Sequence, residues 1–237
     1  SGPLSIKGDH SDIMYALNTG WIILFADTPQ AVYDMNICAL KLAEKVNLPV
    51  IVAFDGFFTS HQKRRCMVFE SDEDVRKFVG RREPETDLLD MTRPLTIGSY
   101  MNEPDIINNK YQLHQAMNRR QTGFRPFMKN MRKFPAEATG LFRNVIWKMQ
   151  KQPFLFSVPP IIQFVPPCIS SGKREEGRRI YGKRLRPFPA EALYKVCKHV
   201  KTLIVADRQD SYGAGGGNMT LEMKAMLQSF GKGCGDI

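Results

Sequence analysis

The chain has 237 residues, of which 43% are hydrophobic, so it is long enough to bury a core in one large or two modest domains. No apolar run approaches the roughly 18 residues that a membrane-spanning helix needs. The start, Ser1-Gly2-Pro3-Leu4, lacks the basic and apolar regions of a signal peptide. We therefore expect a soluble protein that stays in the cytoplasm and does not associate with membranes.

The net charge of +10 is concentrated in one part of the chain. Residues 109–188 contain 17 Lys and Arg against 3 Asp and Glu, whereas the rest of the chain contains 17 against 21. A nucleic-acid-binding module would use such cations to contact phosphates. Because the basic segment is abnormal in other ways, we keep nucleic-acid binding only as an alternative interpretation.

The cysteine, histidine and acidic residues do not form a recognisable metal-binding or disulfide pattern. The five cysteines stand singly, without a Cys-x-x-Cys pair, which predicts neither disulfides nor a zinc or iron–sulfur site on this chain. The densest polar cluster, Lys7-Gly8-Asp9-His10-Ser11-Asp12, could bind a metal, but adjacent residues rarely point at one ion. We expect instead a loop at the mouth of a sheet, with His10 hydrogen-bonded to backbone or to a neighbouring subunit.

The first stretch of the chain predicts a strand–helix–strand unit. Residues 21–25 and 49–54 are short apolar runs, typical of strands in a buried parallel sheet. Between them, Asp27 or Thr28 can cap a helix that ends at Asn47, and apolar residues recur there every three or four positions. A connection of this length implies that the two strands are parallel.

The carboxyl ends of such strands are where ligands bind in α/β proteins. This edge would carry Asp55-Gly56 and the polar residues Thr59-Ser60-His61. His61 and Cys66 have no evident catalytic triad in the sequence, so we interpret both as structural.

A linker and a second α/β stretch follow. The mixed charge and prolines of residues 63–95 predict a solvated linker with a short helix that begins near residues 70–74. Pro187 and Pro189 precede a predicted helix with apolar residues Leu193, Val196, Cys197 and Val200, and residues 202–206 predict a strand. The glycine-rich residues 213–217 form a turn that departs from a dinucleotide fingerprint, so we favour a plain turn. The last helix should face inward with Met219, Met223, Met226, Leu227 and Phe230.

The segment between Arg119 and Arg179 resists interpretation. Seven prolines interrupt it, and apolar clusters such as Phe154-Leu155-Phe156 fit neither a helical nor a strand period. About sixty residues without readable structure are unusual inside a compact domain. We hypothesise that two compensating insertions or deletions in the DNA have put part of this segment out of frame; genuine divergence or a disordered insert is the alternative.

Three motifs in order resemble a known enzyme family. Residues 4–13, which include Lys7-Gly8-Asp9-His10-Ser11-Asp12, residues 18–21 and residues 54–61 are similar to the α region of pyruvate:ferredoxin oxidoreductases and related 2-oxoacid:ferredoxin oxidoreductases. Residues 89–105, 186–189 and 205–208 resemble the later parts of that region. The resemblance covers about residues 1–118 and 180–230.

This resemblance implies an α/β fold with two domains. Residues 1–62 would be the C-terminal part of a thiamine-pyrimidine-binding domain, 63–95 a linker, and 96–237 a parallel α/β domain like the C-terminal domain of transketolases, with 119–179 aberrant. The family oxidises and decarboxylates 2-oxoacids, most commonly pyruvate, passes electrons to ferredoxin and transfers the acyl group to coenzyme A.

The resemblance also implies cofactors, partners and site residues. Thiamine diphosphate with Mg²⁺ would be shared with a partner chain or domain, and iron–sulfur clusters would lie on other subunits or domains. On this chain, the cofactor wall would comprise Leu4, Ser5, Ile6, Asp9 and His10. No catalytic residue and no metal ligand is expected here.

The family's arginine for the substrate carboxylate and its activating acidic residue would fall before Ser1. We therefore expect a fragment that is inactive alone and needs the thiamine-binding and ferredoxin-like subunits. A non-catalytic structural relative of that subunit is the alternative within the family.

Overall fold

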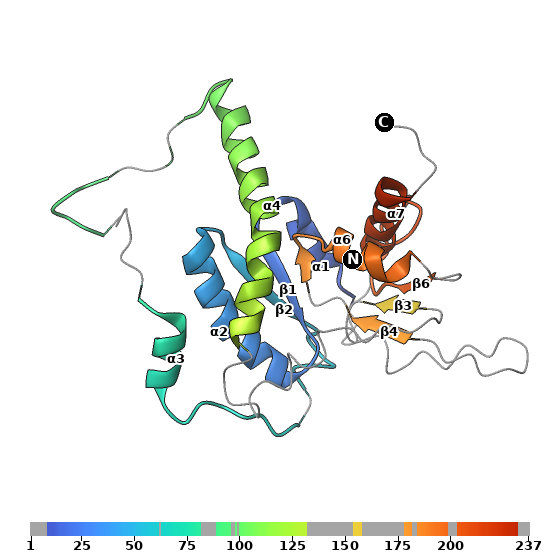
Figure 1. Cartoon of the computed structure of the whole chain (residues 1–237), viewed down its shortest axis with the longest axis horizontal. Helices are drawn as coiled ribbons and strands as arrows, with labels where there is room; N and C mark the ends of the chain where they lie inside the picture. The colour runs from blue at the N-terminus through green and yellow to red at the C-terminus, as the bar shows by residue number, and fades with distance from the viewer. Residues whose placement is uncertain are drawn as a thin grey trace, which may run out of the picture.

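The computed structural model describes the residues that form the central sheets and their helices. It contains two three-stranded sheets, with strand orders β2-β1-β5 and β4-β3-β6, and helices packed around them, so the α/β class predicted from the sequence is confirmed. Figure 1 shows the two sheets side by side. In the described part of the chain, no helix is long and apolar enough to cross a membrane. The described residues are 9–61, 63–81, 89–95, 98, 100–131, 154–157, 178–181, 184–198 and 203–231.

The predicted strand–helix–strand unit is present. Strand β1 (Ile22–Ala26), helix α2 (Pro29–Val46) and strand β2 (Val50–Phe54) follow one another, and β1 pairs with β2 in parallel. The Thr28 hydroxyl caps α2 by accepting a hydrogen bond from the Ala31 N–H at 3.1 Å. Asn47 ends the helix in the left-handed conformation, with φ at 53°.

A strand from the second half of the chain completes the first sheet. Strand β5 (Arg184–Arg186) pairs antiparallel with the free edge of β1, and Ile23 lies opposite Arg186. Helix α6 (Ala190–Cys197), strand β6 (Leu203–Ala206) and helix α7 (Asn218–Phe230) follow in the order predicted from the sequence. The antiparallel strand itself was not predicted, because three residues are too few to show a period.

The second sheet corrects the interpretation of the middle segment. Strand β3 (Phe154–Ser157) lies between β4 (Arg178–Tyr181) and β6 and pairs in parallel with both. Residues 154–157, which fit neither a helical nor a strand period in the sequence, are therefore a strand in the structure. A central strand of a parallel sheet needs no alternation of polar and apolar residues, so a short apolar run suffices. Residues 132–153 and 158–177 lie outside the described residues.

Helix α4 (Asp105–Met131) is a second correction, because it runs through Pro126 into the same segment. In Figure 1 it lies across the first sheet and α2. The turn at Gly20, with φ at 83°, lies so close to α4 that a Cβ at position 20 would be 2.6 Å from a methyl carbon of Leu113. In the predicted linker, Ser71 caps the short helix α3 (Asp72–Val79), which packs Phe78 against α2.

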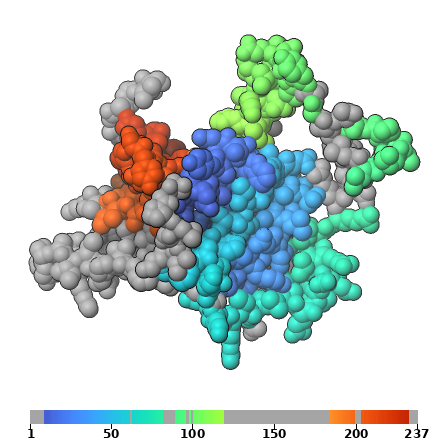
Figure 2. All heavy atoms as spheres, turned by 180° about the vertical axis from the view of Figure 1, so that it is seen from behind, coloured from blue at the N-terminus to red at the C-terminus, as the bar shows by residue number. Residues whose placement is uncertain are grey.

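The two faces of β1 belong to two different cores. Ile22, Leu24 and Ala26 face α2, whereas Ile23 and Phe25 face a core built from both halves of the chain. This shared core contains residues from α1 (Ser11–Met14), η1 (Tyr15–Asn18), β5, α6 and α7. Figure 2 shows the C-terminal residues packed against the N-terminal ones. The two halves therefore fold against each other.

The inward face of α7 is narrower than the sequence predicts. Met219, Met223 and Met226 are buried as expected, but Leu227 and Phe230 are 38% and 42% exposed. The Phe230 ring stacks on Tyr194 of α6 with centroids 5.3 Å apart. Those two positions lie at the end of the helix, where it leaves the shared core.

Leu185→Ala tests whether the halves share one core. Leu185 in β5 is fully buried among residues of both halves, so its truncation should lower the free energy of unfolding by about 2–5 kcal/mol. Urea unfolding of the chain measures this loss. Leu40→Ala is the control, because Leu40 on α2 is 54% exposed, and its effect should stay within about 0.5 kcal/mol. Similar effects for both variants would argue against the shared core.

Candidate functional site

Three polar side chains from distant parts of the chain meet beyond the carboxyl ends of the two sheets. Asp55 directly follows β2, and Arg208 stands two residues after β6. His10 immediately precedes α1. The carboxyl edge of parallel strands is where α/β proteins bind ligands, and here two such edges converge. This group, His10, Asp55 and Arg208, is hereafter called the edge triad.

A buried ion pair holds the edge triad together. The Arg208 Nη1 lies 2.6 Å from the Asp55 Oδ2, and their side chains are 14% and 4% exposed. The other carboxylate oxygen of Asp55 accepts hydrogen bonds from the backbone N–H groups of Phe57, at 2.9 Å, and Phe58. The Arg208 guanidinium also lies over the Phe58 ring, 5.0 Å from its centroid. Both charges are therefore compensated in the interior.

His10 is fixed through both its backbone and its side chain. Its N–H donates to the Arg208 carbonyl at 3.2 Å, and its ring lies 4.7 Å from that of Phe25 in β1. The Nε2 is 3.5 Å from the Asp55 Oδ2, longer than a well-formed hydrogen bond. Burial, followed by the positive charge of Arg208, lowers the pKa of His10 below its ordinary value, although Asp55 opposes the shift. The imidazole is therefore neutral at pH 7.

Of the other residues predicted for the cofactor wall, the structure describes only Asp9. Asp9 is exposed, and one of its carboxylate oxygens accepts hydrogen bonds from the Ser11 N–H at 3.0 Å and the Ser11 hydroxyl at 2.6 Å. These hydrogen bonds lower the pKa of Asp9, with the hydroxyl contributing most. Asp9 therefore stabilises the start of α1. Leu4, Ser5 and Ile6 lie outside the described residues.

The polar residues after β2 split into a buried and an exposed part. Thr59 is buried, whereas Ser60 and His61 are exposed, with the Ser60 Oγ 2.8 Å from the His61 Nδ1. Three buried atoms at this edge, His10 Nδ1, His10 Nε2 and Thr59 Oγ1, have no hydrogen-bond partner within the structure as described. Sequence reasoning named Asp55 and Arg208 only as parts of separate motifs, since nothing local signals that they pair.

The glycine-rich turn is not an open phosphate site. The Asp207 carboxylate occupies the start of α7, where it accepts hydrogen bonds from the Thr220 N–H and hydroxyl, both at 3.0 Å. The Asn218 N–H donates to the Gln209 side chain at 3.1 Å. Burial raises the pKa of Asp207, and the Thr220 hydrogen bonds oppose that shift. The Asp207 carboxyl group therefore already occupies this helix N-terminus, which agrees with the plain turn favoured from the sequence.

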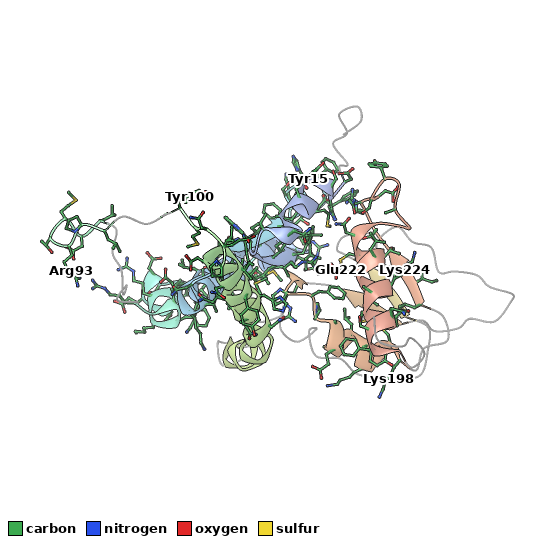
Figure 3. The ribbon with its side chains drawn as sticks, turned by 90° about the horizontal axis from the view of Figure 1, so that it is seen from above. Tyr15, Arg93, Tyr100, Lys198, Glu222 and Lys224 are labelled. Atoms are coloured by element: carbon green, nitrogen blue, oxygen red, sulfur yellow. The ribbon has the colours of Figure 1, made fainter. Side chains whose placement is uncertain are left out.

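A second ion pair ties the halves together on the far side of the shared core. Arg186 of β5 pairs with Glu222 of α7 at 2.5 Å and donates to the Leu17 carbonyl at 3.0 Å. Figure 3 labels Glu222 on the side of α7 nearer the N-terminal elements. Within the described ranges, no group of three or more His, Cys, Asp or Glu could hold a metal ion.

Asp55→Asn tests the buried ion pair. The substitution removes the negative charge that faces Arg208 in the interior, and losing one partner of a buried pair costs about 3–5 kcal/mol of unfolding free energy. Urea unfolding at pH 7 measures the loss. Glu191→Gln is the matched control, because its pair with Lys195 is exposed and should contribute less than about 0.5 kcal/mol. An Asp55→Asn protein as stable as that control would refute a stabilising role.

Gly217→Ala tests the close packing at the start of α7. A Cβ at this position would lie 2.2 Å from the Gln209 carbonyl oxygen and 2.5 Å from the Asp207 Oδ2, so stability should fall by about 1–3 kcal/mol. Gly215→Ala is the control, because the nearest atom to its Cβ is the mobile end of the Lys224 side chain at 3.2 Å. Thermal unfolding of both variants decides, and an undisturbed Gly217→Ala protein would contradict the packing.

Two family models match the chain. "Pyruvate flavodoxin/ferredoxin oxidoreductase, thiamine diP-bdg" matches residues 1–129, and "Pyruvate:ferredoxin oxidoreductase core domain II" matches residues 179–233. The two matches leave residues 130–178 between them, which is most of the segment that resists interpretation from the sequence.

Curated proteins give the same assignment. The chain is 35% identical to "Pyruvate synthase subunit PorA" of Thermotoga maritima, over 90% of this chain and 55% of that protein. It is 27% identical to the subunit of the same name from Methanocaldococcus jannaschii, over 97% and 60%. It is also 27% identical to "Ketoisovalerate oxidoreductase subunit VorA" of Pyrococcus horikoshii, over 97% and 58%. The chain thus spans somewhat more than half the length of these relatives.

The first family model covers more than half of the chain, and its matched range includes His10 and Asp55 of the edge triad. The second covers Arg208. The chain belongs to the pyruvate flavodoxin/ferredoxin oxidoreductase family.

Proposed function

We propose that this chain is part of the α subunit of a thiamine-diphosphate-dependent 2-oxoacid:ferredoxin oxidoreductase that acts on pyruvate in the cytoplasm. The observation that carries the proposal is the match of residues 1–129 to a thiamine-diphosphate-binding family. Relatives named as pyruvate synthase and ketoisovalerate oxidoreductase subunits support a 2-oxoacid as the substrate class. The products would be acyl-coenzyme A, CO2 and reduced ferredoxin.

The described residues suit contact with the ring system of thiamine, but they offer no open site for its diphosphate. His10 Nδ1 and Thr59 Oγ1 are buried polar atoms left without a partner in the structure as described, and such atoms suit contact with a heterocycle that hydrogen-bonds. The start of α7, in contrast, is occupied by Asp207. Thiamine diphosphate, when bound, supplies the nucleophilic carbon that makes decarboxylation of a 2-oxoacid possible.

The remaining assignments extend the same proposal. Leu4, Ser5 and Ile6 would contact the cofactor, while Asp9 and His10 would hold the loop beside it. Asp9 does so by accepting hydrogen bonds from the N–H and the hydroxyl of Ser11. Mg²⁺ and iron–sulfur clusters would be held by other subunits or domains, and ferredoxin would accept the electrons. Residues 1–62 and 96–237 would form two domains joined by residues 63–95, with β5 of the second domain added to the sheet of the first.

Activity of the assembled enzyme tests this function. The complete oxidoreductase that contains this chain should reduce ferredoxin with pyruvate only when coenzyme A and thiamine diphosphate are present. The isolated chain should give no turnover, because it offers one wall of the site. The measurement is the rate of ferredoxin reduction, compared between pyruvate and 3-methyl-2-oxobutanoate. Faster turnover of the branched substrate would reassign the substrate, and no turnover of any 2-oxoacid would reject the function.

A further inference from the structure

The edge triad connects the segment before α1 to both sheets at once. The His10 backbone N–H donates a hydrogen bond to the carbonyl of Arg208, two residues after β6. The His10 ring packs on Phe25 of β1 and faces the carboxylate of Asp55, directly after β2. Arg208 and Asp55 are themselves paired at 2.6 Å. His10 therefore cannot shift without disturbing one of three contacts, and all three lie on the edge where a ligand of an α/β fold binds.

We propose that His10 is a positioning residue, which acts with Asp55 and Arg208 to fix the backbone before α1 against the carboxyl edges of both sheets. The inference rests on the proposed function, because that backbone leads directly into the segment assigned to the thiamine cofactor. His10 acts through the placement of its own main chain and needs no contact with the substrate. Small misplacement of groups that orient a reactant lowers rates strongly.

The positioning depends on a neutral imidazole. The charged groups that face His10 are Asp55 after β2, Arg208 after β6 and Asp12 of α1. Asp55 is already neutralised by Arg208, so a proton on His10 would put a second cation beside one buried carboxylate. Burial and Arg208 lower the pKa of His10 in the folded chain. The unfolded chain then binds more protons, so the triad weakens as pH falls below about 6.5 and is constant above that value.

His10→Phe and His10→Gln in the assembled enzyme separate positioning from packing. Phe keeps an aromatic ring beside Phe25 but cannot face Asp55 as a polar group, so kcat should fall about 10- to 100-fold while the KM for pyruvate changes less than about 3-fold. Gln keeps a polar N–H near Asp55 and should recover most of kcat. His114→Gln, at an exposed position on α4, is the matched control and should behave as the unaltered enzyme.

The pH profile supplies a readout that a purely structural role would not change. In the unaltered enzyme kcat should fall on the acid side as His10 gains a proton, and in His10→Gln this acid limb should flatten because glutamine does not titrate. Wild-type kcat in His10→Phe, or an unchanged acid limb in His10→Gln, would overturn the inference.

Hydrogen exchange distinguishes a failure of this inference from a failure of the proposed function. In the intact chain, without substrate, His10→Phe should speed amide exchange in residues 11–14 and 57–60 at least about 10-fold relative to His114→Gln. If the assembled enzyme turns over no 2-oxoacid, the proposed function fails and this exchange result alone decides whether His10 fixes the edge. Unchanged exchange would then overturn the positioning role.

Discussion

Asp55 and Arg208 form an ion pair in the interior, where the carboxyl ends of both sheets meet. Burying two charges is expensive, and the cost is offset only when the remaining hydrogen-bonding capacity is satisfied. Here the backbone N–H groups of Phe57 and Phe58 bind the second carboxylate oxygen, and the Phe58 ring covers the guanidinium. The Asp55–Arg208 contact thereby sets both the geometry of the turn after β2 and the position of β6. His10 contacts both residues of this pair.

Strand β1 extends this coupling into the core. Its alternate residues serve two cores, because a strand presents successive side chains to opposite faces of a sheet. One face is covered by α2, which comes from the same stretch of sequence. The other is covered by α6 and α7, which begin more than 160 residues later. The partly buried Arg186–Glu222 pair and the Asp55–Arg208 pair also link the two halves, so the halves are joined by apolar packing and by ion pairs.

Local patterns predicted local structure well and distant contacts poorly. The β1–α2–β2 unit could be predicted from the spacing of its apolar residues, from the Thr28 cap and from Asn47 at the end of the helix. Each of these signals acts within a few residues of the chain. The Asp55–Arg208 pair joins residues 153 positions apart, and no periodicity encodes it. Helix α4 escaped prediction because most of its described side chains are exposed and its apolar residues form no continuous stripe. His10 was expected to be hydrogen-bonded to backbone or to a neighbouring subunit. In the described part of the chain its main-chain N–H donates to the Arg208 carbonyl, whereas its two ring nitrogens have no hydrogen-bond partner.

The segment that the family models leave unmatched nevertheless supplies β3, the central strand of the second sheet. The candidate site does not depend on that strand alone. Strand β6 reaches the first half through Arg208 at its carboxyl end and through the packing of Leu203 and Val205 against the shared core. An irregular or out-of-frame middle segment would therefore weaken the second sheet, whereas the contact of His10 with Phe25 of β1 and the Asp55–Arg208 pair involve no residue of that segment.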